Sequence, residues 1–172
     1  MNTQTISKTV LTFLLFMILQ LLVFRNIVIQ DYAFCFMYIT CILLLPNEIS
    51  QTWVIPIGFL VGLIIDIFYD TAGVHASACV LISYLRTYIV QFLFPNRGLE
   101  TDVVLSINGM GTERFVRYIF IMTLIHHTLL FFVEAGTFQF FVVTVIKIIS
   151  SVLVTTLTIV LLHVVFRGVQ HR

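Results

Sequence analysis

The residues of this chain that are best suited to chemistry are a few charged side chains inside long apolar stretches. Asp66 and Asp70 are four residues apart, so on a helix their carboxyl groups lie on one face and could share a proton. No second base or nucleophile converges with them in the sequence pattern. The chain also has no phosphate-binding glycine loop, no H-E-x-x-H motif and no G-x-S-x-G motif. We therefore expect no catalytic residues and no enzyme activity.

Two adjacent histidines, His126 and His127, resemble a metal-binding motif only superficially. Neighbouring residues on a helix point about 100° apart, so one ion cannot be chelated by both rings unaided, and we expect them to line a seam between helices. Cys35, Cys41 and Cys79 form no C-x-x-C pair and sit in apolar stretches, where a thiol behaves as a small hydrophobic group. The sequence predicts no metal site, no disulfide and no cofactor.

The composition requires a bilayer around these residues. Of 172 residues, 60% are apolar and 10% are charged, whereas soluble domains average about 25% charged residues. So few polar side chains cannot cover a water-exposed surface, which excludes most soluble enzymes. The formal net charge is +1, and no run of like charges provides an arm for nucleic acid. We expect the lipid bilayer as a partner and no nucleic acid.

Six apolar segments predict an all-α integral membrane protein with a single transmembrane domain over residues 1–172. The predicted spans are residues 9–24, 32–45, 53–69, 74–94, 115–133 and 138–166. The second span is the weakest, because its 14 residues would rise only about 21 Å as a helix, against a hydrocarbon core of about 30 Å. It could cross where the bilayer thins, or it could enter and leave on one side and reduce the bundle to five spans.

The positions of lysine and arginine predict the orientation of the bundle. Six spans with the N-terminus in the cytoplasm place most cations on the cytoplasmic side: Lys8, Arg97, Arg114, Arg117, Arg167 and Arg172. Five spans with the N-terminus outside satisfy the rule equally well, because Lys8 and Arg25 only exchange sides. Both arrangements put the C-terminus in the cytoplasm. Both also leave one sizeable cytoplasmic loop, residues 95–113, which is either a surface for a cytosolic partner or a plain linker.

A regular spacing distinguishes the third span. Gly58, Gly62, Asp66 and Asp70 recur every four residues, so they stack on one helix face. Glycines at this spacing allow another backbone to approach closely in lipid. A carboxylate inside a span is costly unless it is paired, and Lys147 is the isolated charge of opposite sign in the same half of the bilayer. We expect Asp66 and Lys147 to be coupled; the alternative is that neighbouring groups satisfy the carboxylate.

This stretch resembles the rod shape-determining protein MreD family. The family pattern is a glycine-rich third helix that ends in an intramembrane aspartate, then a short turn, Gly-x-His-Ala, and a Tyr-Leu pair in the next helix. The matching residues are Gly58, Gly62, Asp66, Gly73, His75, Ala76, Tyr84 and Leu85. The chain departs from the pattern at residues 69–72, Tyr-Asp-Thr-Ala, where many relatives carry a turn with glycine or proline.

The resemblance implies a non-enzymatic scaffold subunit of the bacterial inner membrane that acts in cell elongation, cell shape and the regulation of peptidoglycan synthesis. Such a subunit would bind MreC in the membrane and connect MreB with RodA and its transpeptidase partner. Its cytoplasmic loop would present Arg97, Arg114 and Arg117. Its helix-packing or partner interface would comprise Gly58, Gly62, Asp66, Gly73, His75 and Tyr84.

The fold of this family is also similar to the S components of energy-coupling vitamin transporters, which bind substrate in the membrane. An S component is therefore the alternative function. S components typically carry Ala-x-x-x-Ala in their first helix, where they dock on a transmembrane partner. Residues 7–24 contain no alanine, which favours the scaffold over the transporter subunit.

Overall fold

The computed structural model describes residues 3–94 and 104–170. Within these ranges five helices are long and apolar enough to cross a membrane, as expected for a helical multi-pass membrane protein. They are α1 (Thr3–Leu22), α3 (Gln51–Tyr69), α4 (Val74–Leu93), α6 (Thr112–Ala135) and α7 (Phe141–Gln170).

Shorter elements connect these helices. They are η1 (Phe24–Asn26), β1 (Val28–Ile29), β2 (Ala33–Phe34), η2 (Met37–Ile39), α2 (Thr40–Leu43) and α5 (Ile107–Met110). Strands β1 and β2 pair antiparallel, with Val28 opposite Phe34. Ser106 caps α5, because its hydroxyl accepts a hydrogen bond from Gly109 N at 3.2 Å.

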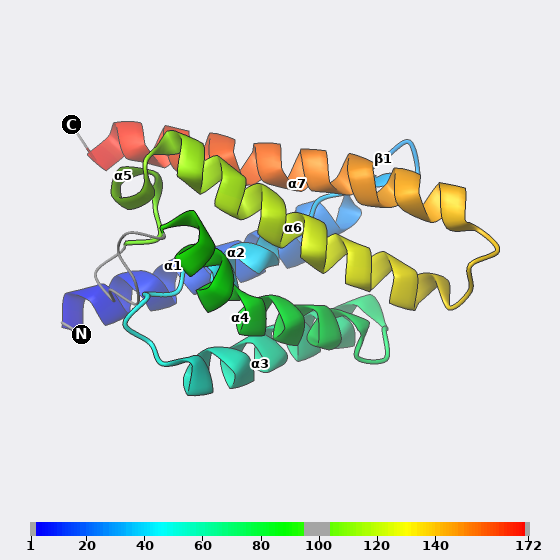
Figure 1. The fold of residues 1–172 in the computed structure, drawn as a ribbon, viewed down its shortest axis with the longest axis horizontal. Helices are drawn as coiled ribbons and strands as arrows, with labels where there is room; N and C mark the ends of the chain where they lie inside the picture. Colours follow the sequence, from blue (N-terminus) through cyan, green and yellow to red (C-terminus); the bar gives the residue numbers. More distant parts are fainter. Residues whose placement is uncertain (1–2, 95–103, 171–172) are drawn as a thin grey trace.

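The segment predicted as the second span does not form a spanning helix, which corrects the expectation of six such helices. Residues 33–45, here called the central segment, contain β2, η2 and α2 in succession. They start at the end of the bundle that holds the turns after α3 and α6, which we call the hairpin end. They then run back to the opposite end, where α3 begins (Figure 1). The chain therefore crosses the bundle here as well, but largely without α-helix.

Mixed backbone conformation allows so short a segment to reach across. Extended backbone rises about 3.3 Å per residue and a 3-10 helix about 2.0 Å, against 1.5 Å for an α-helix. Residues that are too few to cross as an α-helix can cross when part of the segment is extended. As a result, α1 begins and α7 ends at the same end of the bundle (Figure 1).

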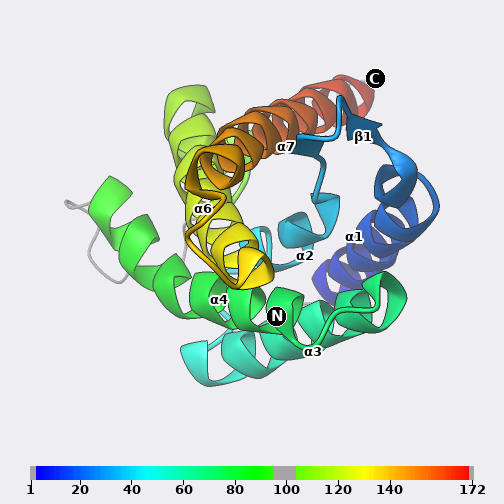
Figure 2. The same ribbon diagram turned by 90° about the vertical axis from the view of Figure 1, so that its right-hand side faces the viewer.

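The central segment forms the axis of the molecule. Figure 2 shows α1, α3, α4, α6 and α7 arranged in a ring around α2. Tyr38, Ile39 and Ile42 of the segment are 0% exposed. Helix α1 reaches the bundle mainly through η2 and α2, whereas α4 packs against both α3 and α6, and α6 packs against α7. Irregular backbone is tolerated at membrane depth only where protein surrounds it, and the ring of helices provides that surrounding.

Candidate functional site

Asp66 lies in the last turn of α3 and caps the first turn of α4. Its Oδ1 accepts hydrogen bonds from Thr71 Oγ1 (2.5 Å) and His75 N (3.0 Å). Its Oδ2 accepts one from Ala76 N (2.8 Å). The first amides of a helix have no partner within the helix, and the helix dipole favours a negative charge beside them. The carboxylate is 3% exposed and is satisfied by the hairpin to which it belongs.

The turn between α3 and α4 depends on two residues in the left-handed region. Asp70 has φ 56° and donates its backbone N–H to Asp66 O, and Gly73 has φ 81°. Glycine adopts this conformation without strain, and aspartate tolerates it better than most residues. A tight hairpin therefore forms although residues 69–72 depart from the MreD pattern.

Gly58 and Gly62 bring α3 against α4. A Cβ on Gly62 would overlap Ala76 Cα and lie 2.6 Å from His75 O. A Cβ on Gly58 would overlap Ser83 Oγ. The glycine face that the sequence predicts as an interface is thus a contact between two helices of this chain. Because α4 already occupies this face, it offers no surface to another protein.

The predicted pair of Asp66 and Lys147 is not formed. The Asp66 carboxylate accepts its hydrogen bonds from the start of α4. Lys147 Nζ lies 5.7 Å from the centroid of the Phe34 ring, and its helix, α7, lies across the ring of helices from α3 (Figure 2). The expectation was wrong because unpaired helix amides can satisfy a carboxylate without a cation. The alternative, that neighbouring groups satisfy Asp66, describes the structure.

Tyr38 of the central segment joins two helices through its hydroxyl. The oxygen lies 2.7 Å from His75 Nδ1 on α4 and 2.9 Å from His126 Nε2 on α6. All three side chains are buried, and each histidine ring meets the tyrosine ring edge to face at a centroid distance of 5.6 Å. A hydroxyl has one proton, so it donates to one imidazole and accepts from the other. One facing ring nitrogen is therefore protonated and the other is not.

His127 has different partners from its neighbour. Its Nδ1 donates to Thr123 O at 2.7 Å, and its Nε2 lies 3.3 Å from Thr155 Oγ1 on α7. The rings of His126 and His127 are inclined by 68°, so they face separate hydrogen-bond partners. In the described part of the chain, no group of three or more His, Cys, Asp or Glu is placed to hold a metal ion.

Gln20 connects α1 to the central segment and is fully buried. Its Nε2 donates to Tyr69 Oη at 2.7 Å and to Cys35 O at 3.3 Å. Its Oε1 accepts from Tyr38 N at 3.3 Å. An amide side chain both donates and accepts, so Gln20 supplies the partners that non-helical backbone lacks.

Helix α7 supplies hydroxyl groups to the same segment. Ser151 Oγ accepts a hydrogen bond from Phe34 N at 2.9 Å. Thr155 Oγ1 accepts one from Phe36 N at 3.1 Å and lies 3.3 Å from Phe34 O, to which it can donate. Ser151 and Thr155 are four residues apart and so share a helix face. These two hydroxyls bind the backbone N–H and C=O groups of residues 34–36, as the backbone of a neighbouring strand would.

Arg86 and Tyr118 hold the other end of the central segment. Arg86 Nη2 donates to Leu45 O, and Tyr118 Oη donates to Leu43 O at 3.0 Å. Arg86 is only 1% exposed. Leu43 is the last residue of α2 and Leu45 lies two residues beyond it. Tyr118 therefore binds a carbonyl at the helix C-terminus, and Arg86 binds one just past it, where a positive charge is favourable.

The structure describes two of the three loop cations that were expected to face cytosolic components, and Arg97 lies outside the described residues. Arg117 Nη2 lies 2.6 Å from Glu113 Oε1, and the two side chains are 64% and 75% exposed. Arg114 Cζ lies 4.9 Å from the centroid of the Phe94 ring. Arg114 and Arg117 thus lie in the first turns of α6, and an exposed ion pair on one helix contributes only about 0.3–0.5 kcal/mol.

The site as a whole is a buried polar network that holds irregular backbone inside a ring of helices. Its members come from α1, the central segment, α3, α4, α6 and α7, and many of their hydrogen bonds end on the chain's own backbone. This arrangement is suited to positioning helices. Sequence reasoning missed Gln20, Tyr38 and Thr155. A general signal for such residues is an isolated polar side chain in an apolar span.

No protein-family model, no curated protein and no solved structure matches this chain. The class of protein follows from the fold itself. Over residues 3–94 and 104–170 it is a helical protein with five helices of membrane-spanning length and apolarity. These helices surround a buried segment that combines extended backbone, a 3-10 helix and one turn of α-helix.

Proposed function

We propose that this chain is a non-enzymatic scaffold subunit of the bacterial inner membrane, similar in role to the MreD family in the cell-elongation complex. In this role it binds MreC within the membrane. It also helps to connect MreB, RodA and the transpeptidase partner of RodA, and its C-terminus lies in the cytoplasm. The support comes from the MreD-like residues and from the contacts that several of them make.

The outward position of Tyr84 is the observation that carries this proposal. Several residues of the MreD-like pattern make contacts inside the chain: Gly58, Gly62, Asp66, His75 and Ala76. Tyr84 differs from them, because it is 48% exposed on the outer face of α4. A contact with another protein is the role that this position can serve.

Tyr84 lies in the middle of α4, and its backbone O accepts a hydrogen bond at 2.8 Å from Nε2 of Gln51, the first residue of α3. Tyr84 is ten residues after Val74, where α4 begins, and nine before Leu93, where α4 ends, so it is about 15 Å from either end. Exposed tyrosines of membrane proteins gather at the two membrane surfaces. A hydroxyl in hydrocarbon is costly without a hydrogen-bond partner. An acceptor on a neighbouring protein helix would satisfy this hydroxyl, whereas lipid chains would not.

Tyr88 extends the same face by one helical turn. It is 53% exposed, its ring centroid lies 5.4 Å from that of Tyr84, and its hydroxyl donates to the Tyr84 hydroxyl at 3.5 Å. This bond uses the proton of Tyr88, so the proton of Tyr84 is available to an acceptor on a partner helix. Interhelical hydrogen bonds of this kind add to packing between membrane helices.

Co-purification from native membranes tests the proposal. The tagged wild-type chain should recover MreC, and the double variant Tyr84→Phe/Tyr88→Phe should recover several-fold less, since it keeps the rings but loses both hydroxyls. Trp53→Phe is the matched control, because Trp53 is an exposed aromatic residue on α3; its recovery should equal that of the wild type. Equal recovery by all three proteins would refute the α4 contact. Recovery of transporter ATPase subunits in place of MreC would refute the scaffold.

A further inference from the structure

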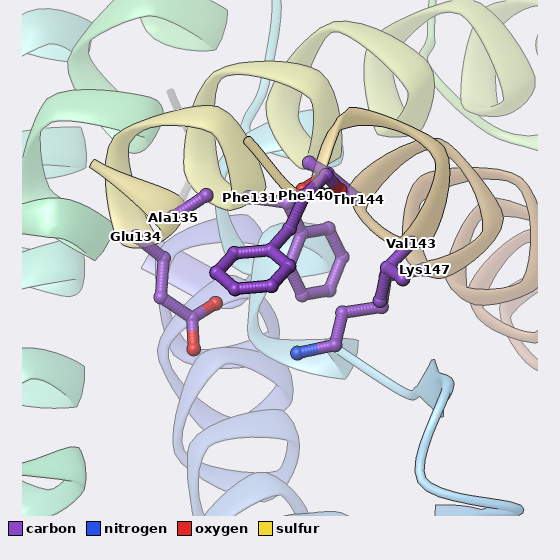
Figure 3. Close-up of a pocket in the computed structure, with 7 residues that line it drawn as sticks. All are labelled: Phe131, Glu134, Ala135, Phe140, Val143, Thr144 and Lys147. Carbon is purple, nitrogen blue, oxygen red and sulfur yellow. Dashed lines mark hydrogen bonds between the residues drawn. The ribbon is translucent and has the colours of Figure 1, made fainter. Parts of the chain in front are cut away.

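A cavity of about 200 Å³ lies between α6 and α7 at the hairpin end. Its lining combines one acid, one base and two aromatic rings, from Glu134, Lys147, Phe131 and Phe140. Figure 3 shows the Glu134 carboxylate and the Lys147 ammonium at opposite sides of the cavity, with the phenyl rings beside them. Neither the scaffold function nor the central polar network involves this cavity.

The two charges are not neutralised by each other. In the part of the chain that the structure describes, Glu134 and Lys147 form no salt bridge together, whereas Arg117 and Glu113 do. The Lys147 ammonium lies over the Phe34 ring, at 5.7 Å from Nζ to the centroid. An aromatic face compensates a cation only in part, so an anion placed in the cavity gains a favourable partner.

Both charges lie near the level where lipid headgroups meet acyl chains. Glu134 is the last residue but one of α6, and Lys147 is six residues after Phe141, the start of α7. Six residues of helix rise about 9 Å. A lysine side chain on a helix leans toward the helix N-terminus and extends its ammonium to the membrane surface. On α7 that direction leads to the hairpin end, toward Glu134.

The cavity has the size of a headgroup and the charges of a zwitterion. Its volume equals that of roughly six water molecules and is below the roughly 300–1,000 Å³ of pockets for whole small molecules. We propose that it binds the headgroup of a zwitterionic phospholipid of the ethanolamine type. Lys147 binds the phosphate, and Glu134 binds the ammonium. The exposed apolar side chains that follow Lys147 along α7, Ile149 and Leu153, then contact the acyl chains.

Native mass spectrometry of the delipidated protein in detergent tests this assignment, with phosphatidylethanolamine and phosphatidylglycerol as the probes. The wild type should retain the ethanolamine lipid at least tenfold better than the glycerol lipid. Lys147→Met should lose both lipids. Glu134→Gln should lose the preference and bind the two lipids alike, because it removes the ammonium partner and the repulsion of an anionic headgroup. Glu134 is exposed, so this variant tests the site without disturbing the core.

Two controls remove charges from the same end of the molecule but outside the cavity. Arg25→Met removes a cation that lies 5.4 Å from the Tyr69 ring, and Asp70→Asn removes an exposed carboxylate from the turn after α3. Both should retain the wild-type preference. Undiminished lipid binding by Lys147→Met would overturn the site. Displacement of the lipid by an equal concentration of free phosphoethanolamine would show a soluble ligand and would overturn the lipid assignment.

Discussion

Asp66 Oδ2 accepts a hydrogen bond from Ala76 N at 2.8 Å, and this bond ties the end of α3 to the beginning of α4. With the bonds from His75 N and Thr71 Oγ1, it gives a buried carboxylate three donors within one hairpin. A charge inside an apolar helix is often a sign of transport or catalysis. Here the hydrogen bonds show that it caps a helix.

Asp66→Asn should destabilise the α3–α4 hairpin. The amide group of asparagine keeps only one oxygen acceptor, so its NH2 group would face either Ala76 N or the donors of Thr71 and His75. The variant would also lose the charge that favours a helix N-terminus. Hydrogen bonds to a charged group contribute about 1.5–3 kcal/mol. Thermal unfolding in detergent should show a lower midpoint for Asp66→Asn than for Asp70→Asn, an exposed control one turn away. Equal midpoints would contradict the capping role.

Gly62→Ala should be more damaging than Gly58→Ala. The new methyl group at Gly62 meets the backbone of Ala76, which cannot move without separating the helices. At Gly58 the main obstacle is the hydroxyl of Ser83, a side-chain atom. Adding Ser83→Ala should therefore restore part of the folded yield of Gly58→Ala. The folded yield of Gly62→Ala, Gly58→Ala and Gly58→Ala/Ser83→Ala is measured as monodisperse protein in size-exclusion chromatography. If Ser83→Ala does not raise the yield of Gly58→Ala, the proposed packing of α3 on α4 is contradicted.

Tyr38→Phe should destabilise the bundle although it removes a single oxygen atom. The change leaves His75 Nδ1 and His126 Nε2 without the hydroxyl that lies between them. A buried polar group without a partner costs about 1–3 kcal/mol. The measurement is the unfolding midpoint in detergent, with Tyr84→Phe, exposed on α4, as the control. If both variants unfold alike, the Tyr38 hydroxyl does not bind the histidines.

Arg86→Met should loosen the end of the central segment. The variant keeps much of the side-chain volume but leaves Leu45 O without its donor, at a cost of about 1–3 kcal/mol. Hydrogen exchange should increase at residues 40–45 before it does in α6. Arg117→Met is the control, since Arg117 is exposed and forms a surface ion pair. Unchanged protection in residues 40–45 would contradict the role of Arg86.

Much of the helical architecture could be predicted from residue type alone. Apolar stretches of about 20 residues must satisfy their own backbone in lipid, so they form helices, and the described residues contain five of them. The glycine and aspartate spacing also predicted one crowded face on the third span. Local sequence could not predict which helix lies on that face, because a glycine permits close approach by any neighbour.

The tertiary structure decided how the polar residues pair and how the shortest apolar stretch crosses. Residues 33–45 are as apolar as a helical span, but they avoid a continuous α-helix because distant side chains bind their backbone: Gln20, Arg86, Tyr118, Ser151 and Thr155. Likewise, Asp66 lies beside α4 amides and not beside Lys147. Sequence by itself determined that the chain forms membrane-length helices, since that depends on local apolarity. Only the fold determined the partners, since these lie on different elements of the chain and meet through packing.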